Sequence, residues 1–279
     1  MSDTPAVSVY GGITNRRITV TDLAKAKDAG EKWPMLTSYD AVTAGLFEEA
    51  GVPVLLVGDS AAMVVHGHST TLPITMDELV PLTAAVVRGT SRALVVADLP
   101  FGSYQEGPVQ ALQSATRFMK ESGAHAVKLE GGRRVTPQIR ALVEAGIPVM
   151  AHVGLTPQSV NALGGYKVQG RGEAGHALLD DALAVQEAGA FAVVLEVVPH
   201  DLAERVTKEL DIPTIGIGAG NATDAQVLVW QDLLGLTPGR APKFVKPYAD
   251  LRGVMTGAVR AWAQDVTSGE YPDLDHSYN

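Results

Sequence analysis

Short runs of apolar residues recur along the chain, and most are followed by a segment whose apolar positions lie three or four residues apart. The runs are rich in valine, leucine and isoleucine, as is typical of strands buried on both faces of a parallel sheet. The segments between them carry helix signals, such as a glycine just after the last turn. The pattern predicts strands and helices that alternate through the whole chain.

Eight runs are candidate strands, and the eighth is the weakest. They are Met35–Ser38, Val54–Val57, Leu94–Ala97, Ala126–Leu129, Pro148–Ala151, Ala192–Leu195, Pro213–Ile217 and Leu233–Leu236. Eight strand–helix units with right-handed crossovers close most simply into a (β/α)8 barrel of the TIM type, an α/β fold. A doubly wound open sheet is the alternative.

The helices between these strands complete the expected barrel. Thr21 is expected to cap a short N-terminal helix that runs to about Ala29. The other expected helices are Ala41–Ala50, Asp77–Arg88, Pro108–Ser122, Thr136–Ala145, Gly175–Ala188, His200–Leu210, Ala222–Trp230 and the C-terminal Leu251–Val266. The 279 residues contain no linker-like segment, so we expect one domain over 1–279, with residues 1–12 as a flexible tail.

Acidic residues stand where four of the apolar runs end: Asp59, Asp98, Glu130 and Glu196. Barrel enzymes keep their chemistry at the carboxyl ends of the strands. Carboxylates gathered there repel one another, because a pair about 4 Å apart costs roughly 4 kcal/mol at an effective dielectric of 20. A metal ion, a proton or the cation of Lys128 must offset that repulsion.

Side chains alternate along a strand, so Lys128 and Glu130 are expected to lie on the same face. For the same reason, a shared face is expected for four other pairs: Val57 and Asp59, Val96 and Asp98, Met150 and His152, and Val194 and Glu196. Oxygen ligands without thiolates favour Mg²⁺ or Mn²⁺. We expect Asp59 and Asp98 to bind the metal directly and Glu130 to bind it directly or through water. Glu196 is then free to act as a general base beside the carbonyl of a 2-oxo acid, which predicts metal-assisted enolisation.

Composition narrows the class of protein. The chain has no cysteine, which excludes disulfides, thiolate zinc sites and cysteine nucleophiles. The net charge of −9 argues against nucleic acid or an anionic membrane as the main partner. The N-terminus shows no signal-peptide pattern, and no apolar stretch is long enough to span a bilayer, so we expect a cytoplasmic protein.

Three loop segments leave alternatives open. The loop Ser60–Thr75 holds His66 and His68, which are either metal ligands or ordinary loop residues. In the loop Val153–Glu173, the stretch Gly164–Gly172 has the composition of a lid, although a plain surface loop would also fit. The glycines of Gly216–Gly220 either cradle a phosphate at a helix N-terminus or only permit a tight turn.

Nine short motifs occur along the chain in a fixed order. They are Met35–Asp40, Leu56–Ser60, Gly67–Pro73, Ala97–Phe101, Lys128–Gly132, His152–Gln158, Gly164–Gly172, Leu195-Glu196 and Ile215–Asn221. Together they resemble the ketopantoate hydroxymethyltransferase (3-methyl-2-oxobutanoate hydroxymethyltransferase) family over nearly the whole chain.

The resemblance implies a metal-dependent aldol-type reaction on a (β/α)8 barrel. A one-carbon unit would pass from 5,10-methylenetetrahydrofolate to 3-methyl-2-oxobutanoate, giving 2-dehydropantoate, a precursor of pantothenate and coenzyme A. Ser60, Asp98, Lys128 and His152 match substrate contacts of the family, and Glu196 matches its proposed base. A homo-oligomer, typically a decamer, and Mg²⁺ are also implied.

Two other classes of function are weighed against this one. The first is a Mg²⁺-dependent 2-oxo-acid lyase or mutase of the phosphoenolpyruvate mutase-like barrel type, in which a cysteine on a mobile loop is typical. The second is a non-catalytic barrel that serves as a binding or scaffold protein. The absence of cysteine argues against the lyase form, and the retention of all the strand-end charged residues argues against the non-catalytic one.

Overall fold

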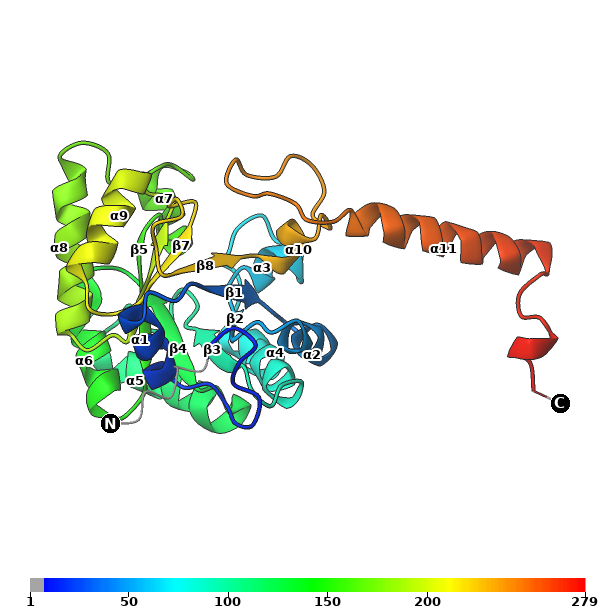
Figure 1. Cartoon of the computed structure of the whole chain (residues 1–279), viewed down its shortest axis with the longest axis horizontal. Coiled ribbons are helices and arrows are strands. Elements are labelled where there is room, and N and C mark those ends of the chain that lie inside the picture. The colour runs from blue at the N-terminus through cyan, green and yellow to red at the C-terminus, as the bar shows by residue number, and fades with distance from the viewer. Residues whose placement is uncertain (1–7, 279) are drawn as a thin grey trace. The chain divides into compact units, whose positions relative to one another are not determined.

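The computed structural model describes residues 8–278 (Figure 1). They divide into two compact units, the first ending at Val229 and the second beginning at Trp230. In the first unit, eight parallel strands close into a barrel in sequence order. Their bounds are β1 Trp33–Thr37, β2 Val54–Val57, β3 Leu94–Asp98, β4 Ala126–Glu130, β5 Val149–Gly154, β6 Ala192–Glu196, β7 Thr214–Ile217 and β8 Ala225–Leu228. The barrel prediction is confirmed, and the open sheet is wrong because β1 pairs with β8.

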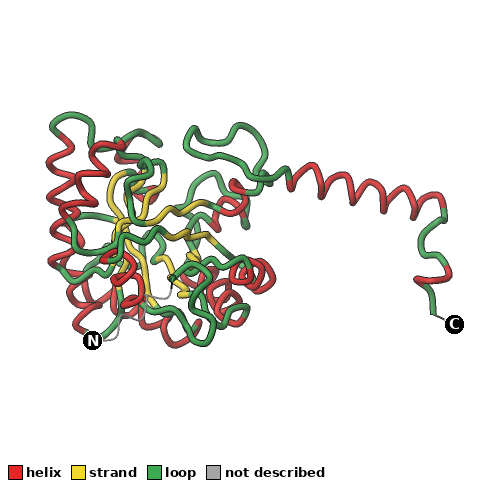
Figure 2. Tube along the Cα trace, in the orientation of Figure 1, coloured by secondary structure: helices red, strands yellow, loops and turns green. Residues whose placement is uncertain are grey.

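Helices surround the strands of this unit (Figure 2). They are α1 Val20–Asp28, α2 Ala41–Glu49, α3 Ala61–Val64, α4 Met76–Arg88, α5 Pro108–Arg117, α6 Thr136–Glu144, α7 Val160–Leu163, α8 Ala174–Glu187 and α9 His200–Glu209. A π-helical turn, η1 Phe118–Ser122, continues α5, and two 3-10 turns, η2 Arg133–Val135 and η3 Pro157–Ser159, follow β4 and β5. The expected helices up to His200–Leu210 are confirmed to within a few residues.

The eighth strand was placed wrongly. The segment Ala225–Leu228, expected within a helix, is strand β8, and the expected strand Leu233–Leu236 overlaps the short helix α10, Trp230–Leu233. Pairing decides the outcome, because β8 hydrogen-bonds to both β7 and β1 and closes the barrel. Within the described residues, β7 and β8 are therefore joined by a loop without a helix.

The start of α1 also differs from the prediction. The cap is Thr19, not Thr21, because the carboxylate of Asp22 accepts a hydrogen bond from the backbone N–H of Thr19 at 2.9 Å. An acid three residues after a threonine is the capping-box arrangement, which satisfies two otherwise unpaired donors at the helix start.

The expected flexible tail, residues 1–12, falls partly outside the described residues, which begin at residue 8. Within the described part, the start of the chain makes specific contacts, and flexibility of residues 1–12 stays a prediction. Val9 is buried in the main hydrophobic cluster, and the carboxylate of Glu31 accepts hydrogen bonds from the Ser8 hydroxyl (2.6 Å) and the Val9 N–H (2.8 Å).

The barrel interior explains why charged side chains reach its mouth. Alternate positions of the strands, among them Val96, Met150 and Val194, pack into the central hydrophobic cluster. Two residues further along the same strands come Asp98, His152 and Glu196. Because alternate residues share a face, the apolar filling of the barrel and the polar groups at its mouth belong to the same rows of side chains.

The second unit contains α10, α11 Leu251–Ser268 and the 3-10 turn η4 Leu274–His276. The prediction of a C-terminal helix is confirmed, and α11 begins at a cap in which the Asp250 carboxylate accepts a hydrogen bond from Gly253 N–H. No residue of α11 is buried. Met255, Val259, Trp262 and Val266 are exposed and lie three to four residues apart, and with the neighbouring Val254 they form an apolar stripe. Among the described residues, none of the helices is long and apolar enough to cross a membrane.

Candidate active site

Five of the predicted site residues form one chain of contacts across β3 to β6. Lys128 Nζ lies 2.7 Å from Asp98 Oδ1 and 3.8 Å from Glu130 Oε1. His152 completes the chain, with Nδ1 at 3.5 Å from Glu130 Oε1 and Nε2 at 3.3 Å from Glu196 Oε2. Strand register causes this arrangement, because Asp98 pairs with Lys128 and Glu130 with His152.

Asp59 reaches the same cluster by a different route. On β2 it is Val54 and Leu56 that pack into the barrel, so the alternation predicted for Val57 and Asp59 is wrong. Asp59 lies two residues beyond the strand, where the chain turns, and its backbone N–H donates to Asp98 Oδ2 at 3.2 Å. The turn, rather than the pleat, places this carboxylate beside the others.

Burial and mutual repulsion act on the two aspartates. Burial is the largest cause that raises the pKa of Asp59 well above its usual value, and the charges of Asp98 and Glu130 raise it further. Burial also raises the pKa of Asp98, although Lys128 works against that effect. Without additional positive charge, the cluster therefore disfavours full ionisation.

Lys128 and His152 supply the positive charge that is present. Burial alone would lower the pKa of Lys128, but Asp98, Glu130 and Asp59 outweigh burial and raise it. For His152, burial and Lys128 act to lower the pKa, and Glu130 and Glu196 raise it to about 9. Burial would raise the pKa of Glu130, but His152 and Lys128 lower it. The two flanking carboxylates therefore favour the protonated form of the imidazole.

Some buried polar atoms of the cluster are unsatisfied. Among the described residues, Glu130 Oε1 and both ring nitrogens of His152 are buried without a hydrogen-bond partner. Within residues 8–278, no group of three or more histidine, aspartate or glutamate side chains is placed so that together they could hold a metal ion. Oxygen donors that leave coordination positions open suit Mg²⁺, which binds one or two carboxylates and completes its shell with water and substrate.

Ser60 lies at the edge of the cluster. Its hydroxyl is 2.8 Å from the hydroxyl of Tyr39 at the end of β1. A side chain at Gly58 would come within 2.9 Å of Ser60 Oγ, so the glycine leaves room for this hydroxyl. Ser60 is thus held next to Asp59, where a contact to a bound substrate was expected.

Two residues that the sequence did not assign to the site hold the acids in place. The side-chain amide of Gln158 donates to Asp59 Oδ2 at 3.0 Å, and its backbone N–H donates to Glu130 Oε2 at 3.0 Å. The hydroxyl of Tyr104 donates to Gln158 Oε1 at 2.7 Å and accepts from the Glu130 N–H at 3.2 Å. Gln158 stands within the motif His152–Gln158, which was the available signal, whereas Tyr104 lies in a loop without a motif.

The predicted lid, Gly164–Gly172, lies close to the acids. Burial is the main cause that raises the pKa of Tyr166, and the charges of Asp59, Glu196 and Glu130 raise it further. The loop is also tied to the strand that carries Glu196, because the Gln169 N–H donates to the Val197 carbonyl at 3.0 Å.

Val197, directly after Glu196, has a φ of 49°. A β-branched residue rarely adopts a left-handed conformation, and such residues gather at functional sites. Two backbone hydrogen bonds hold it there, one from its own N–H to the Ile217 carbonyl at 2.8 Å and one from Gln169. The turn that follows the candidate base is therefore strained and firmly held.

For His66 and His68 and for the glycine run Gly216–Gly220, the structure favours an ordinary loop over a ligand site. His66 and His68 are exposed, and their rings are 6.4 Å apart with no third ligand among the described residues. The glycine run Gly216–Gly220 leads into a loop and strand β8, so the helix N-terminus that a phosphate would need is absent there.

The family model of ketopantoate hydroxymethyltransferase matches residues 17–274 of this chain. The chain belongs to the ketopantoate hydroxymethyltransferase family. A 3-methyl-2-oxobutanoate hydroxymethyltransferase of Streptomyces coelicolor is 67% identical over 271 residues, covering 97% of this chain and 93% of that protein. One of Thermobifida fusca is 64% identical over 278 residues, covering 99% of each. The predicted family and the transferase class are confirmed.

Solved structures add a comparison at the level of the fold. The 2,3-dimethylmalate lyase, a member of the PEP mutase/isocitrate lyase superfamily, matches with a TM-score of 0.59 and 20% identity, covering 94% of this chain and 92% of that one. At this identity the likeness concerns the barrel alone. The likeness to this lyase therefore supports a shared fold but not a lyase or mutase activity. Family membership supports the transferase.

We expect Gln158→Leu to destabilise the protein by about 1–3 kcal/mol, because it leaves the buried Asp59 Oδ2 and Leu99 carbonyl without their donor. Chemical denaturation would measure the change. The exposed Gln113, on the outer surface of α5, supplies the control Gln113→Leu, for which we expect a change within about 0.5 kcal/mol. Equal effects of the two substitutions would contradict the positioning role of Gln158.

Proposed function

We propose that this chain transfers a hydroxymethyl unit from 5,10-methylenetetrahydrofolate to 3-methyl-2-oxobutanoate, giving 2-dehydropantoate, a step of pantothenate biosynthesis. The observation that carries the proposal is the 67% identity to a relative named for this activity over 97% of the chain. The cluster of Asp59, Asp98, Lys128, Glu130, His152 and Glu196 supports it, because it provides a base beside a densely charged binding site.

Glu196 is the proposed general base. It ends β6 at the barrel mouth, is less buried than the other acids of the cluster, and has Oε2 3.3 Å from His152 Nε2. Its carboxylate takes the proton from C3 of the 2-oxo acid, and the electron pair of the broken C–H bond forms the enolate double bond between C2 and C3. His152, itself positioned between Glu130 and Glu196, orients the base.

The new carbon–carbon bond forms when C3 of the enolate attacks the methylene carbon of the folate. The bonds from that carbon to the folate nitrogens break, water supplies the hydroxyl oxygen of the product, and tetrahydrofolate leaves. We assign Ser60, Asp98, Lys128 and His152 to contacts with the 2-oxo acid. Lys128 is suited to that role because its buried cation, bound to Asp98, stabilises negative charge that develops beside it.

Mg²⁺ fits the oxygen donors of this cluster. Asp59 and Asp98 would hold it, with Glu130 bound directly or through water, and the unsatisfied Glu130 Oε1 supports this assignment. The repulsion that raises the pKa of Asp59 would be relieved by a divalent cation. The chemistry that Mg²⁺ supplies when bound to a 2-oxo acid is polarisation of the keto group.

We also propose that the chain assembles into a homo-oligomer, as the family resemblance implies, with a decamer as the expected state. The apolar stripe of α11 supports assembly, since none of the helix residues is buried in the single chain. An exposed stripe of this kind marks an interaction surface in soluble proteins. Light scattering on the purified protein would give the mass, and a monomer at micromolar concentration would contradict this part of the proposal.

Product formation from the two substrates should require Mg²⁺ and stop with excess chelator. Asp98→Ala should weaken Mg²⁺ binding measured by calorimetry, because it removes a proposed ligand. Asp201→Ala, an exposed acid on α9, is the charge-matched control and should bind Mg²⁺ like the unmodified protein. Unchanged affinity in Asp98→Ala would overturn the ligand assignment.

Glu196→Gln should reduce turnover by at least ~10²-fold, the contribution typical of a general base. Binding of Mg²⁺ and of the 2-oxo acid should persist, because the amide keeps the size of the side chain. Exchange of the C3 hydrogen of the 2-oxo acid with deuterated solvent reports proton abstraction directly and should slow in parallel. The exposed Glu209 provides the control Glu209→Gln. Normal exchange in Glu196→Gln would remove this residue from the mechanism.

A further inference from the structure

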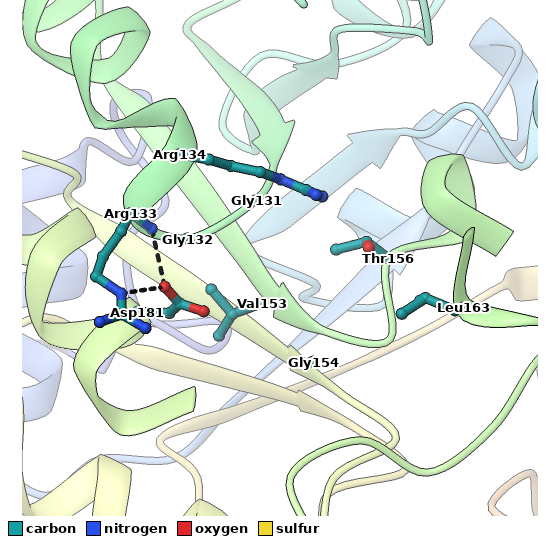
Figure 3. Close-up of a pocket in the computed structure, with 9 residues that line it drawn as sticks. All are labelled: Gly131, Gly132, Arg133, Arg134, Val153, Gly154, Thr156, Leu163 and Asp181. Atoms are coloured by element: carbon teal, nitrogen blue, oxygen red, sulfur yellow. Dashed lines mark hydrogen bonds and ion pairs between the residues drawn. The ribbon is translucent and has the colours of Figure 1, made fainter. Parts of the chain in front are cut away.

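A pocket of about 380 Å³ lies beside the active site (Figure 3). Its lining comes from the segment after β4, from the end of β5 with the turn that follows it, from Leu163 at the end of α7, and from α8. The residues that matter for the argument are Gly131, Arg133, Arg134, Gly154, Thr156 and Asp181. Its volume is in the range of pockets that hold small organic ligands, roughly 300–1,000 Å³.

The pocket shares its wall with the catalytic cluster. Gly131 follows Glu130 directly, and its backbone N–H donates to the His152 carbonyl at 2.9 Å. Gly154 is paired in register with Glu196. Because successive residues of a strand point to opposite faces, Gly131 faces the outer side of the barrel wall whose inner side carries Glu130, while Gly154 lies beside Glu196 at the rim. A molecule that spans the rim would thus contact both sites.

The pocket contains one neutralised arginine and one that is not neutralised. Arg133 Nε lies 3.0 Å from Asp181 Oδ1 (Figure 3). The guanidinium of Arg133 is also 3.6 Å from Asp180 Oδ2. The guanidinium of Arg134 donates to Ser159 Oγ at 3.0 Å, and no ion pair to it is present among residues 8–278. Arg134 therefore offers most of its donors and a full positive charge to a ligand.

Two glycines make room for this arrangement. A Cβ at Gly132 would collide with the carboxyl group of Asp181, so only glycine permits the close clamp on Arg133. A Cβ at Gly131, where φ is +129°, would come within 3.0 Å of the Val135 side chain and within 3.3 Å of Arg134 Nε. Glycine at this position therefore leaves room for the Val135 and Arg134 side chains.

We propose that this pocket binds the glutamate tail of the folate co-substrate, with Arg134 pairing to a tail carboxylate. The inference rests on the proposed function. The methylene carbon of 5,10-methylenetetrahydrofolate bridges the reduced pterin and the nitrogen that carries the benzoyl-glutamate. When the methylene faces the enolate at the barrel mouth, the tail must extend past the rim, and this pocket lies directly behind the rim. Guanidinium groups bind carboxylates through two parallel hydrogen bonds, which suits the tail.

Steady-state kinetics with two one-carbon donors tests the inference. Arg134→Gln should raise the KM for 5,10-methylenetetrahydrofolate at least ~10-fold, the effect of losing a charged hydrogen bond. It should leave unchanged the KM for 5,10-methylenetetrahydropteroate, which lacks the glutamate. Arg134→Lys keeps the positive charge but loses the two parallel hydrogen bonds of a guanidinium. Its KM for 5,10-methylenetetrahydrofolate should therefore lie between those of the unmodified protein and Arg134→Gln. Arg140→Gln, an exposed arginine of α6 outside the pocket lining, is the matched control and should behave like the unmodified protein.

Solvent-deuterium exchange at C3 of the 2-oxo acid separates this inference from the proposed function. The exchange needs no folate, so Arg134→Gln should retain it at the unmodified rate. An unchanged KM for the glutamate-bearing donor, or an equal rise for both donors, would overturn the tail site while exchange still supports the enolisation chemistry. Absence of exchange in the unmodified protein would instead contradict the proposed function itself.

Discussion

The buried ion pair between Asp98 and Lys128 is the interaction on which the site depends. Their side chains meet at 2.7 Å inside the barrel mouth, because β3 and β4 pair in a register that places the two residues side by side. Removing one partner of a buried pair typically costs about 3–5 kcal/mol, since the other charge is left without compensation. Together with His152, whose effect is larger, Lys128 lowers the pKa of Glu130 in a place where burial would raise it.

The closed barrel gives this pair its surroundings. Apolar rows inside the barrel end in the charged residues, so the same packing that stabilises the fold fixes where the charges appear. Gln158 then connects Asp59 and Glu130, which come from different strands, through its side chain and its backbone N–H. Charge, hydrogen bonding and strand register thus constrain one another, and no single acid is positioned by its own strand alone.

The sequence predicts the strands that carry chemistry because their signals are local. Apolar runs of four or five residues that stop at an acid identify Asp98, Glu130 and Glu196 without further information. The eighth strand was not predicted, because Ala225–Leu228 has no such signal and its pairing with β7 and β1 decides its structure. The roles of Tyr104 and Gln158 were not predicted for a similar reason, because they arise from a contact between residues 54 positions apart in the sequence.

The conformation of Val197 has a consequence for how the enzyme moves between turnovers. Its left-handed backbone, with a φ of 49°, stores strain of order 1–3 kcal/mol, and the hydrogen bond from the Gln169 N–H helps to hold it. The loop is therefore linked by one hydrogen bond to the residue that follows Glu196. Without that bond, of the two backbone hydrogen bonds only the one from the Val197 N–H to the Ile217 carbonyl would remain, so any movement of the loop would act first on the backbone beside the proposed base.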